Sequence, residues 1–210
     1  TSRIVRLART AAAEEESSEL ANRAVLNQPD PVYGRQLQNF ALSGLKTEGS
    51  MAIAYEEIPV TLDDGTEVNL RKPHYSVDNP GYGPLHADTT LSARVAPSLP
   101  GMGLLQAIHP ADILSRADPQ DEDGDGISGK AAFTRDDNGR IALGRFGWKA
   151  QNPDIRVQTA DAFLNDIGIS TSDRTNGHGD CTQSQAECLA MPAGVQVNLG
   201  ETEAPDPVLD

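Results

Sequence analysis

Large aromatic side chains are scarce in this sequence, whereas turn-forming residues are abundant. Its 210 residues include four Phe, four Tyr and one Trp, against 19 Gly and 14 Pro. Few large side chains leave a small core, and glycine and proline favour turns, so we expect much of the chain to be turn and irregular connection. A bound metal, a prosthetic group or neighbouring polypeptide would help to order such a chain.

Basic residues and long apolar runs are also lacking. The chain has 17 Lys and Arg against 31 Asp and Glu, which gives a formal net charge of -14. Nucleic acids and anionic membranes are disfavoured as partners, because binding phosphate needs a concentrated cationic face. No apolar run is long enough to span a bilayer. The chain begins at Thr1 with neither an initiator Met nor a signal peptide, and we interpret it as a mature or excised piece.

Only two cysteines are present, Cys181 and Cys188, seven residues apart. A zinc site would need four clustered ligands, so the pair favours one local disulfide, with two free thiols, or metal or redox chemistry, as alternatives. A disulfide indicates an oxidising compartment, and we therefore expect the protein to be periplasmic or secreted.

Motifs of a self-contained active site are missing as well. The sequence has no Gly-x-Ser-x-Gly elbow, phosphate loop, Gly-x-Gly-x-x-Gly fingerprint, His-Glu-x-x-His pair or Cys-x-x-Cys-His haem-attachment motif. Composition and spacing therefore indicate an acidic module without an active site of its own.

The periodicity that is present predicts the α+β class, with mainly short helices, long loops and one two-stranded β-arm. The arm comprises residues 51–62 and 68–77, which flank the turn signal Asp63-Asp64-Gly65. We expect helices over residues 1–26, from Asp30 to before Gly44, and in two pieces after Pro100. We divide the chain into an N-terminal helical segment (1–29), a central domain (30–191) and an acidic C-terminal tail (192–210).

Two later helices have clear end signals. Ile155, Thr159, Phe163 and Ile167 recur at four-residue spacing after Asn152-Pro153 and before Gly168, which predicts a helix capped at both ends. Thr182 and Gln185 have the spacing of a capping box for a short helix that contains Cys188.

An acidic glycine loop is the candidate metal site. Asp121, Asp123 and Asp125 alternate, and Gly126 occupies the sixth position, as at the start of a calcium loop. Ile127, at the seventh position, completes the set of metal candidates. The twelfth position is Ala132 instead of a bidentate Glu, so a bound Ca²⁺ would need further oxygens, such as those of Asp118, Asp136 or Asp137. A turn-rich loop without a cation is the alternative.

Several motifs together resemble a known family, the di-haem thiol oxidoreductases, bacterial proteins related to the di-haem cytochrome c peroxidases. The motifs, in chain order, are Asp-Pro-Val-Tyr-Gly-Arg-Gln-Leu-Gln from Asp30, Tyr-Gly-Pro-Leu-His from Tyr82, Gly-Leu-Leu-Gln-Ala-Ile from Gly103, Ala-Asp-Ile-Leu from Ala111, Asp-Gly-Asp-Gly-Ile-Ser-Gly from Asp123, Gly-Arg-Phe-Gly-Trp-Lys-Ala from Gly144, and Asp-Cys-Thr from Asp180. The resemblance covers about residues 30 to 191.

The resemblance implies a role in electron transfer by c-type haems. In this family the two Cys-x-x-Cys-His sites flank the segment seen here, so the chain would be the central part of a haem oxidoreductase and not catalytic alone. Trp148 would be a candidate electron relay by analogy, with a plain core anchor as the alternative. His86 and Met102 would be weak candidates for haem ligands, and a calcium ion between the haems would favour the acidic loop as its site.

The resemblance also implies a partner for the chain, and two other functions are alternatives to it. The partner would be the remainder of the di-haem protein or a redox partner. The alternative function is a haem-free, calcium-stabilised extracytoplasmic binding or structural module. A thiol-disulfide enzyme using Cys181 and Cys188 is disfavoured, because the spacing lacks redox-motif geometry and no neighbouring cation would lower a thiol pKa.

Overall fold

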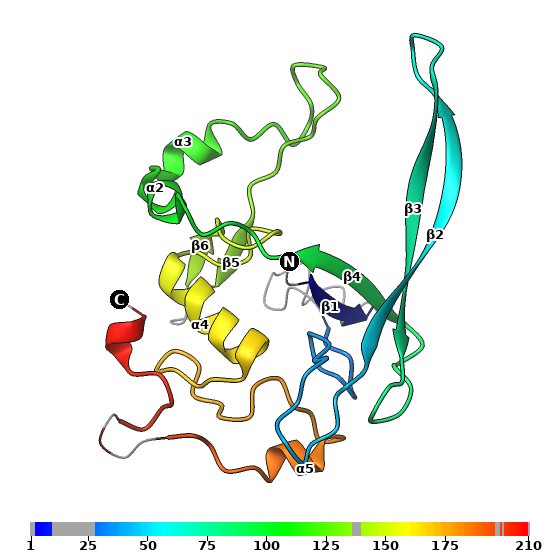
Figure 1. Cartoon of the computed structure of the whole chain (residues 1–210). Coiled ribbons are helices and arrows are strands. Elements are labelled where there is room, and N and C mark those ends of the chain that lie inside the picture. Colours follow the sequence, from blue (N-terminus) through cyan, green and yellow to red (C-terminus); the bar gives the residue numbers. More distant parts are fainter. Residues whose placement is uncertain (1–2, 10–27, 136–139, 196–197, 199, 210) are drawn as a thin grey trace. The chain divides into compact units, whose positions relative to one another are not determined.

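The computed structural model describes residues 3–9, 28–135, 140–195, 198 and 200–209 (Figure 1). Within them, three separate two-stranded antiparallel sheets pair β1 with β4, β2 with β3 and β5 with β6. The elements are β1 (Arg3–Arg9), β2 (Ser50–Thr61), β3 (Glu67–Asp78), β4 (Thr89–Val95), α2 (Met102–Ala107), α3 (Pro110–Leu114), β5 (Phe133–Arg135), β6 (Ile141–Leu143), α4 (Ile155–Ile167), α5 (Ala186–Leu189) and the short turn η1 (Asp206–Val208). Short helices, small sheets and long loops confirm the predicted α+β class.

The described chain divides into two compact units, each built from separate stretches of sequence. Among the described residues, unit 1 contains residues 3–9, 29–95 and 181–190, and unit 2 contains Gln28 and residues 96–135, 140–180, 191–195, 198 and 200–209. The predicted boundaries at 29/30 and 191/192 stay a prediction. No helix among the described residues is long and apolar enough to cross a membrane.

The core of unit 1 lies where β1 meets its neighbours. Val5, Leu7, Tyr33 and Leu37 are buried together. β1 pairs with β4 on one side, with Leu7 opposite Leu91. On its other side Leu7 N donates to Arg35 O at 2.7 Å, and Leu37 N donates to Val5 O at 3.0 Å. The sequence pattern did not predict strand β4.

Two predicted helices of unit 1 are wrong. Residues 3–9 form a strand, because Val5 and Leu7 alternate with less buried neighbours and face one core. Residues 10–27 lie outside the described residues. The segment from Asp30 forms a turn, because the Asp30 carboxylate accepts from Val32 N and Tyr33 N, at 2.8 and 3.0 Å, and so competes with helical hydrogen bonds.

The arm of unit 1, residues 50–78, confirms the predicted hairpin. Strands β2 and β3 pair in register from Ser50–Asp78 to Thr61–Glu67. Gly65 has a φ of 82°, and Asp64 Oδ1 accepts from Thr66 N at 2.9 Å, so the turn residues act as their types predict.

Helix α4 of unit 2 confirms the predicted helix and its end at Gly168, which has a φ of 68°. Its N-cap lies two residues later than expected, at Asp154 instead of Asn152, and accepts from Val157 N at 2.8 Å. The four residues at this spacing are not the buried residues of the helix. Val157 and Ala160 are buried, whereas Ile167 is 59% exposed, because a step of four residues exceeds the helical repeat of 3.6 and winds around the helix.

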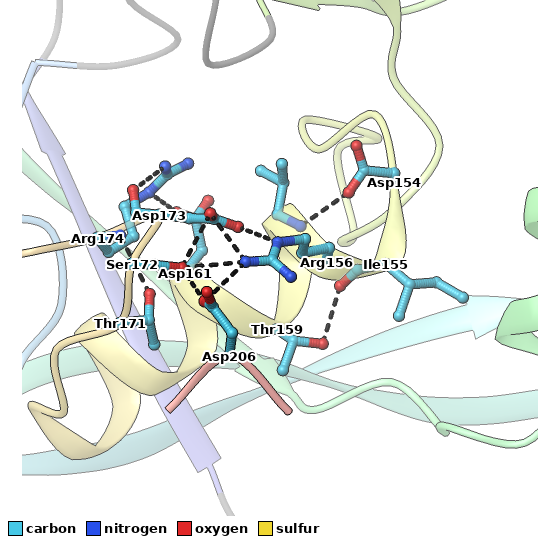
Figure 2. A network of polar contacts seen from close by, with 11 residues as sticks. Asp154, Ile155, Arg156, Thr159, Asp161, Thr171, Ser172, Asp173, Arg174 and Asp206 are labelled. Atoms are coloured by element: carbon cyan, nitrogen blue, oxygen red, sulfur yellow. Dashed lines mark hydrogen bonds and ion pairs between the residues drawn. The ribbon is translucent and has the colours of Figure 1, made fainter. Parts of the chain in front are cut away.

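Ion pairs tie α4 to later parts of unit 2 (Figure 2). Arg156 donates from Nε to Asp173 Oδ2 at 2.7 Å and from Nη2 to Asp206 Oδ1 at 3.1 Å. Arg174 Nε donates to Asp161 Oδ1 at 2.7 Å. Ala204 and Leu209 are buried, so part of the predicted surface tail packs into unit 2.

Candidate functional site

The acidic loop of unit 2 is a closed loop that brings three carboxylates together. Asp118 N donates to Gly129 O at 2.9 Å and joins the two ends of the loop. Carboxylate oxygens of Asp118, Asp121 and Asp123 lie within 4.8 Å of one another. An oxygen-only set of this kind suits a hard divalent cation such as Ca²⁺.

The same carboxylates also shape the loop. Asp118 Oδ1 accepts from Glu122 N at 2.9 Å, Asp121 Oδ1 accepts from Gly126 N at 3.1 Å, and Asp123 Oδ1 accepts from Asp125 N at 3.2 Å. Gly126 has a φ of 85°, the backbone conformation that a glycine adopts without steric cost. The carboxylates therefore converge through local hydrogen bonds within the loop.

The predicted metal candidates are brought together only in part. Asp121 and Asp123 belong to the cluster, with Asp118 as its third member. Asp125 is outside this group and accepts from Ile127 N at 2.8 Å. The carbonyl oxygen of Ile127 accepts from Gly129 N at 3.0 Å. Asp136 and Asp137 lie outside the described residues.

The motif from Gly144 forms a tight loop in which Phe146, not Trp148, is the buried aromatic residue. Phe146 is 2% exposed, and Trp148 is 62% exposed. Phe146 N donates to Asn152 O at 2.9 Å, and Asn152 N donates back to Phe146 O at 3.2 Å. The interpretation of Trp148 as a core anchor is therefore wrong. Its indole lies on the surface of unit 2.

Arg145 of this motif binds the carboxyl end of α2. Its Nη1 donates to the carbonyl oxygens of Leu105, Gln106 and Ile108, at 3.1, 2.9 and 2.5 Å. Gln106 Oε1 in turn accepts from Ile155 N at the start of α4, at 2.8 Å. Two motifs that are forty residues apart in the chain (Arg145 and Leu105) are thus joined in space. Met102, the ligand candidate, is the half-buried first residue of α2.

His86 lies in unit 1, beside the buried carboxylate of Asp30. Asp30 Oδ2 accepts from His86 N at 3.0 Å and from Thr89 Oγ1 at 2.6 Å. The imidazole Nδ1 of His86 accepts from Asp88 N at 3.3 Å. In the neutral ring this bond places the proton on Nε2. A histidine that binds a metal through Nε2 instead has its proton on Nδ1, so the ring as it stands is not arranged to bind through Nε2.

Two tyrosines complete the junction between the motifs of unit 1. Tyr33 Oη donates to Gly83 O at 2.5 Å and accepts from Tyr82 N at 3.1 Å, and the two rings meet edge to face. Burial is the largest influence on the pKa of Tyr33 and raises it. The phenol therefore stays protonated and holds the two motifs together at neutral pH.

The predicted disulfide between Cys181 and Cys188 is present. Its loop is bound to the rest of unit 1: Thr182 Oγ1 donates to Val32 O and Gln185 Nε2 donates to Glu48 Oε1, both at 2.6 Å. Gln185 Oε1 accepts from Thr182 N at 2.8 Å, but α5 begins at Ala186 with Gln185 as its N-cap, so the predicted capping box with Thr182 at the N-cap is wrong. The Thr182 hydroxyl serves a tertiary contact instead.

Sequence reasoning missed the roles of Asp30, Glu48 and Arg145. Glu48 is 4% exposed and accepts from Gln38 N at 2.6 Å as well as from Gln185. Only the Asp30 position had a local signal, an Asp followed by Pro, which favours a turn. The partners of Glu48 and Arg145 are distant in the chain.

Comparison with known proteins finds one match. A family model described as "Di-haem oxidoreductase, putative peroxidase" matches residues 35–177, about two thirds of the chain. No curated protein and no solved structure matches this chain.

Proposed function

Because this chain belongs to the di-haem oxidoreductase family, we propose that it is the central segment of a periplasmic oxidoreductase with two c-type haems. The family match over residues 35–177 is the observation that carries the proposal. The chain would take part in electron transfer for a peroxidase-like or thiol oxidoreductase reaction and would not be catalytic alone.

The residues of this chain do not fit covalent attachment of haem. Each c-type haem is attached through a Cys-x-x-Cys-His motif, and the two cysteines here are seven residues apart and joined to each other. Attachment would therefore come from polypeptide outside these 210 residues. What this chain would contribute is surface against which the haem-bearing parts pack.

Unit 2 has such a surface near Met102. Leu99 and Leu104, on either side of Met102, are 75% and 78% exposed, and none of the residues of α2 is buried. These exposed apolar side chains are the part of unit 2 that we propose the haem-bearing polypeptide would cover. Met102 remains a proposed haem ligand. His86 could be a haem ligand through Nε2 only if the hydrogen bond from Asp88 N to its Nδ1 were broken, because the ring proton must then be on Nδ1.

Trp148 is the proposed electron relay, and the haem-bearing protein tests both proposals. We expect the protein expressed with its flanking coding sequence to show a Soret band and covalently bound porphyrin by mass spectrometry. Trp148→Phe should slow electron transfer between the haems at least about tenfold with unchanged haem content, because a phenyl ring is a poorer redox relay than an indole; tenfold corresponds to about 1.4 kcal/mol of barrier.

The matched control is Phe40→Leu, which removes an aromatic ring that is 84% exposed in unit 1. Equal rates in the Trp148 and Phe40 variants would contradict the relay role. Native protein without porphyrin would contradict the di-haem proposal itself.

We further propose that Asp118, Asp121 and Asp123 hold a calcium ion, on the strength of their convergence. If the native protein also proves free of haem, this site favours the alternative function, a calcium-stabilised extracytoplasmic module. A cation that binds only the folded state raises the melting temperature by mass action.

Calorimetry with and without Ca²⁺ tests this site. Asp121→Asn should abolish the increase in melting temperature, and Asp63→Asn, in the turn of the arm, should keep it. A melting temperature that is the same in Ca²⁺ and in excess chelator would rule out the site.

A further inference from the structure

The β2–β3 arm exposes apolar side chains far from the core of unit 1. Because cross-strand partners share a face, Glu56, Ile58 and Val60 of β2 lie on one face with Lys72, Leu70 and Val68 of β3. We call these six residues the distal face. Ile58 is 37% exposed and Leu70 is 54% exposed.

The contacts of the charged residues confirm this assignment of faces. Lys72 Nζ lies 3.8 Å from Glu56 Oε2, so both belong to the distal face. Arg71 lies over the ring of Tyr55, 5.0 Å from its centroid, on the opposite face. That opposite face also contains Met51 and Val77, which pack against the core of unit 1 at the base of the arm. The distal face is therefore on the side that this core leaves exposed.

Among the described residues no further strand pairs with the outer edges of the arm, and prolines make these edges poorly suited to such pairing. Pro59 pairs with Asn69, and Pro73 pairs with Tyr55, so both prolines lie on the same face of the arm. Both pairs are therefore of the same type, either hydrogen-bonded or non-hydrogen-bonded, because the two types alternate along an antiparallel ladder. A proline has no N–H to donate to the neighbouring strand, so this is the class whose amide positions point outward. Each edge therefore lacks one outward N–H donor, at Pro73 in the middle of β3 and at Pro59 near the end of β2. A partner would accordingly meet the arm through a face.

We propose that the distal face is a dimer interface, occupied by the distal face of a second copy of this chain. A two-fold axis parallel to the strands places β2 of one copy over β3 of the other. Each cross-strand pair of one copy then faces the same cross-strand pair of the second copy. Ile58 then meets Leu70, and Val60 meets Val68. Glu56 of each copy meets Lys72 of the other, so charge as well as apolar surface is complementary.

Charge favours this arrangement over a second possible dimer, in which the two-fold axis runs across the strands. An axis across the strands through the Ile58–Leu70 row sets Glu56 of one copy against Val60 of the other. That contact would place a carboxylate on an apolar side chain, at a cost in desolvation. A two-stranded hairpin is also marginally stable alone, so covering its apolar face stabilises the arm itself.

Sedimentation equilibrium of the full chain over a range of concentrations tests the proposal. We expect a dimer whose dissociation constant rises at least about 30-fold in Leu70→Asp, because a carboxylate enters the interface twice. The control, Asn69→Asp, adds the same charge at the neighbouring position of the opposite face and should leave the constant within about twofold. A wild-type monomer at every concentration overturns the proposal, as does an equal effect of the two variants.

Two charge variants test the row-to-row pairing in solution. Glu56→Lys sets like charges opposite each other in its own dimer, and Lys72→Glu does the same. Mixed together, the two variants regain both opposite-charge contacts, so we expect the mixture to dimerise more tightly than either variant alone by at least about tenfold. A mixture no tighter than its components overturns the proposal. The test does not depend on haem.

Discussion

Gly144 shows how closely single residues are fitted in the loop that precedes Trp148. A Cβ atom at Gly144 would lie 1.8 Å from the carbonyl oxygen of Ala150. The neighbouring atoms belong to the backbone of a loop that is hydrogen-bonded across Phe146 and Asn152. The loop therefore cannot move aside without losing these bonds, and glycine is required there for space.

Gly144→Ala and Gly103→Ala are predicted to have opposite effects on stability. The first should lower the free energy of unfolding by about 3 kcal/mol or more through overpacking. Gly103 lies in α2 with nothing within 4 Å of its Cβ position, so alanine there should raise helix stability by up to about 1 kcal/mol. Urea unfolding of the two variants checks both signs. A neutral Gly144→Ala would contradict the packing of this loop.

At the scale of elements, α2 depends on a distant side chain. None of its six residues is buried, so burial of an apolar face contributes little to its stability. Arg145 Nη1 binds three carbonyl groups at its carboxyl end, where a cation also interacts favourably with the helix dipole.

Arg145→Ala should therefore release α2. We expect hydrogen exchange of the amides of residues 105–107 to speed up by at least about tenfold, from the loss of about 1.4 kcal/mol or more of local stability. Arg116→Ala, which removes an exposed arginine just after α3, should leave these amides unchanged. Equal protection in both variants would show that Arg145 does not hold the helix.

At the scale of the whole molecule, both units contain carboxylates whose pKa is lowered by hydrogen bonds. Burial raises the pKa of Asp30 in unit 1, but bonds from Thr89, His86, Val32 and Tyr33 outweigh it and lower the pKa from 3.8. In unit 2, burial likewise raises the pKa of Glu203, and bonds from Ser170 and Gly194 bring it below 4.5. The Ser172 hydroxyl, with Arg156, lowers the pKa of Asp206.

Stability should therefore fall in acid in both units. A carboxylate with a lowered pKa stabilises the fold fully above its unfolded-state pKa, and the stabilisation is lost as pH falls through its folded-state value. We expect the free energy of unfolding to begin to fall near pH 4.5, the ordinary pKa of a Glu, and to continue below 3.8, that of an Asp. Asp30→Asn should flatten this profile in unit 1, measured by urea unfolding against pH. An unchanged slope would contradict the role of Asp30.

Local chemistry in the sequence determined the features whose partners are close in the chain. Asp63, Asp64 and Gly65 predicted the hairpin, Gly168 predicted the end of α4, and two cysteines seven residues apart predicted the disulfide. These features need only turn geometry, a cap or a short loop closure. The family motifs in the sequence likewise indicated the di-haem oxidoreductases, the family that the match over residues 35–177 shows.

Only the tertiary structure decided the pairing of β1 and the closure of two loops. β1 is a strand because β4 pairs with it from more than eighty residues away, as Thr90 Oγ1 bonding Ala8 O illustrates. Phe146 is buried and Trp148 exposed because of how one loop folds back on Asn152. Asp118 joins Asp121 and Asp123 because Gly129 closes their loop. The pairing of β1 depends on a strand that is distant in the chain. The two loop closures, between Phe146 and Asn152 and between Asp118 and Gly129, span few residues but have no turn or cap signal in the sequence, so residue spacing could not predict them.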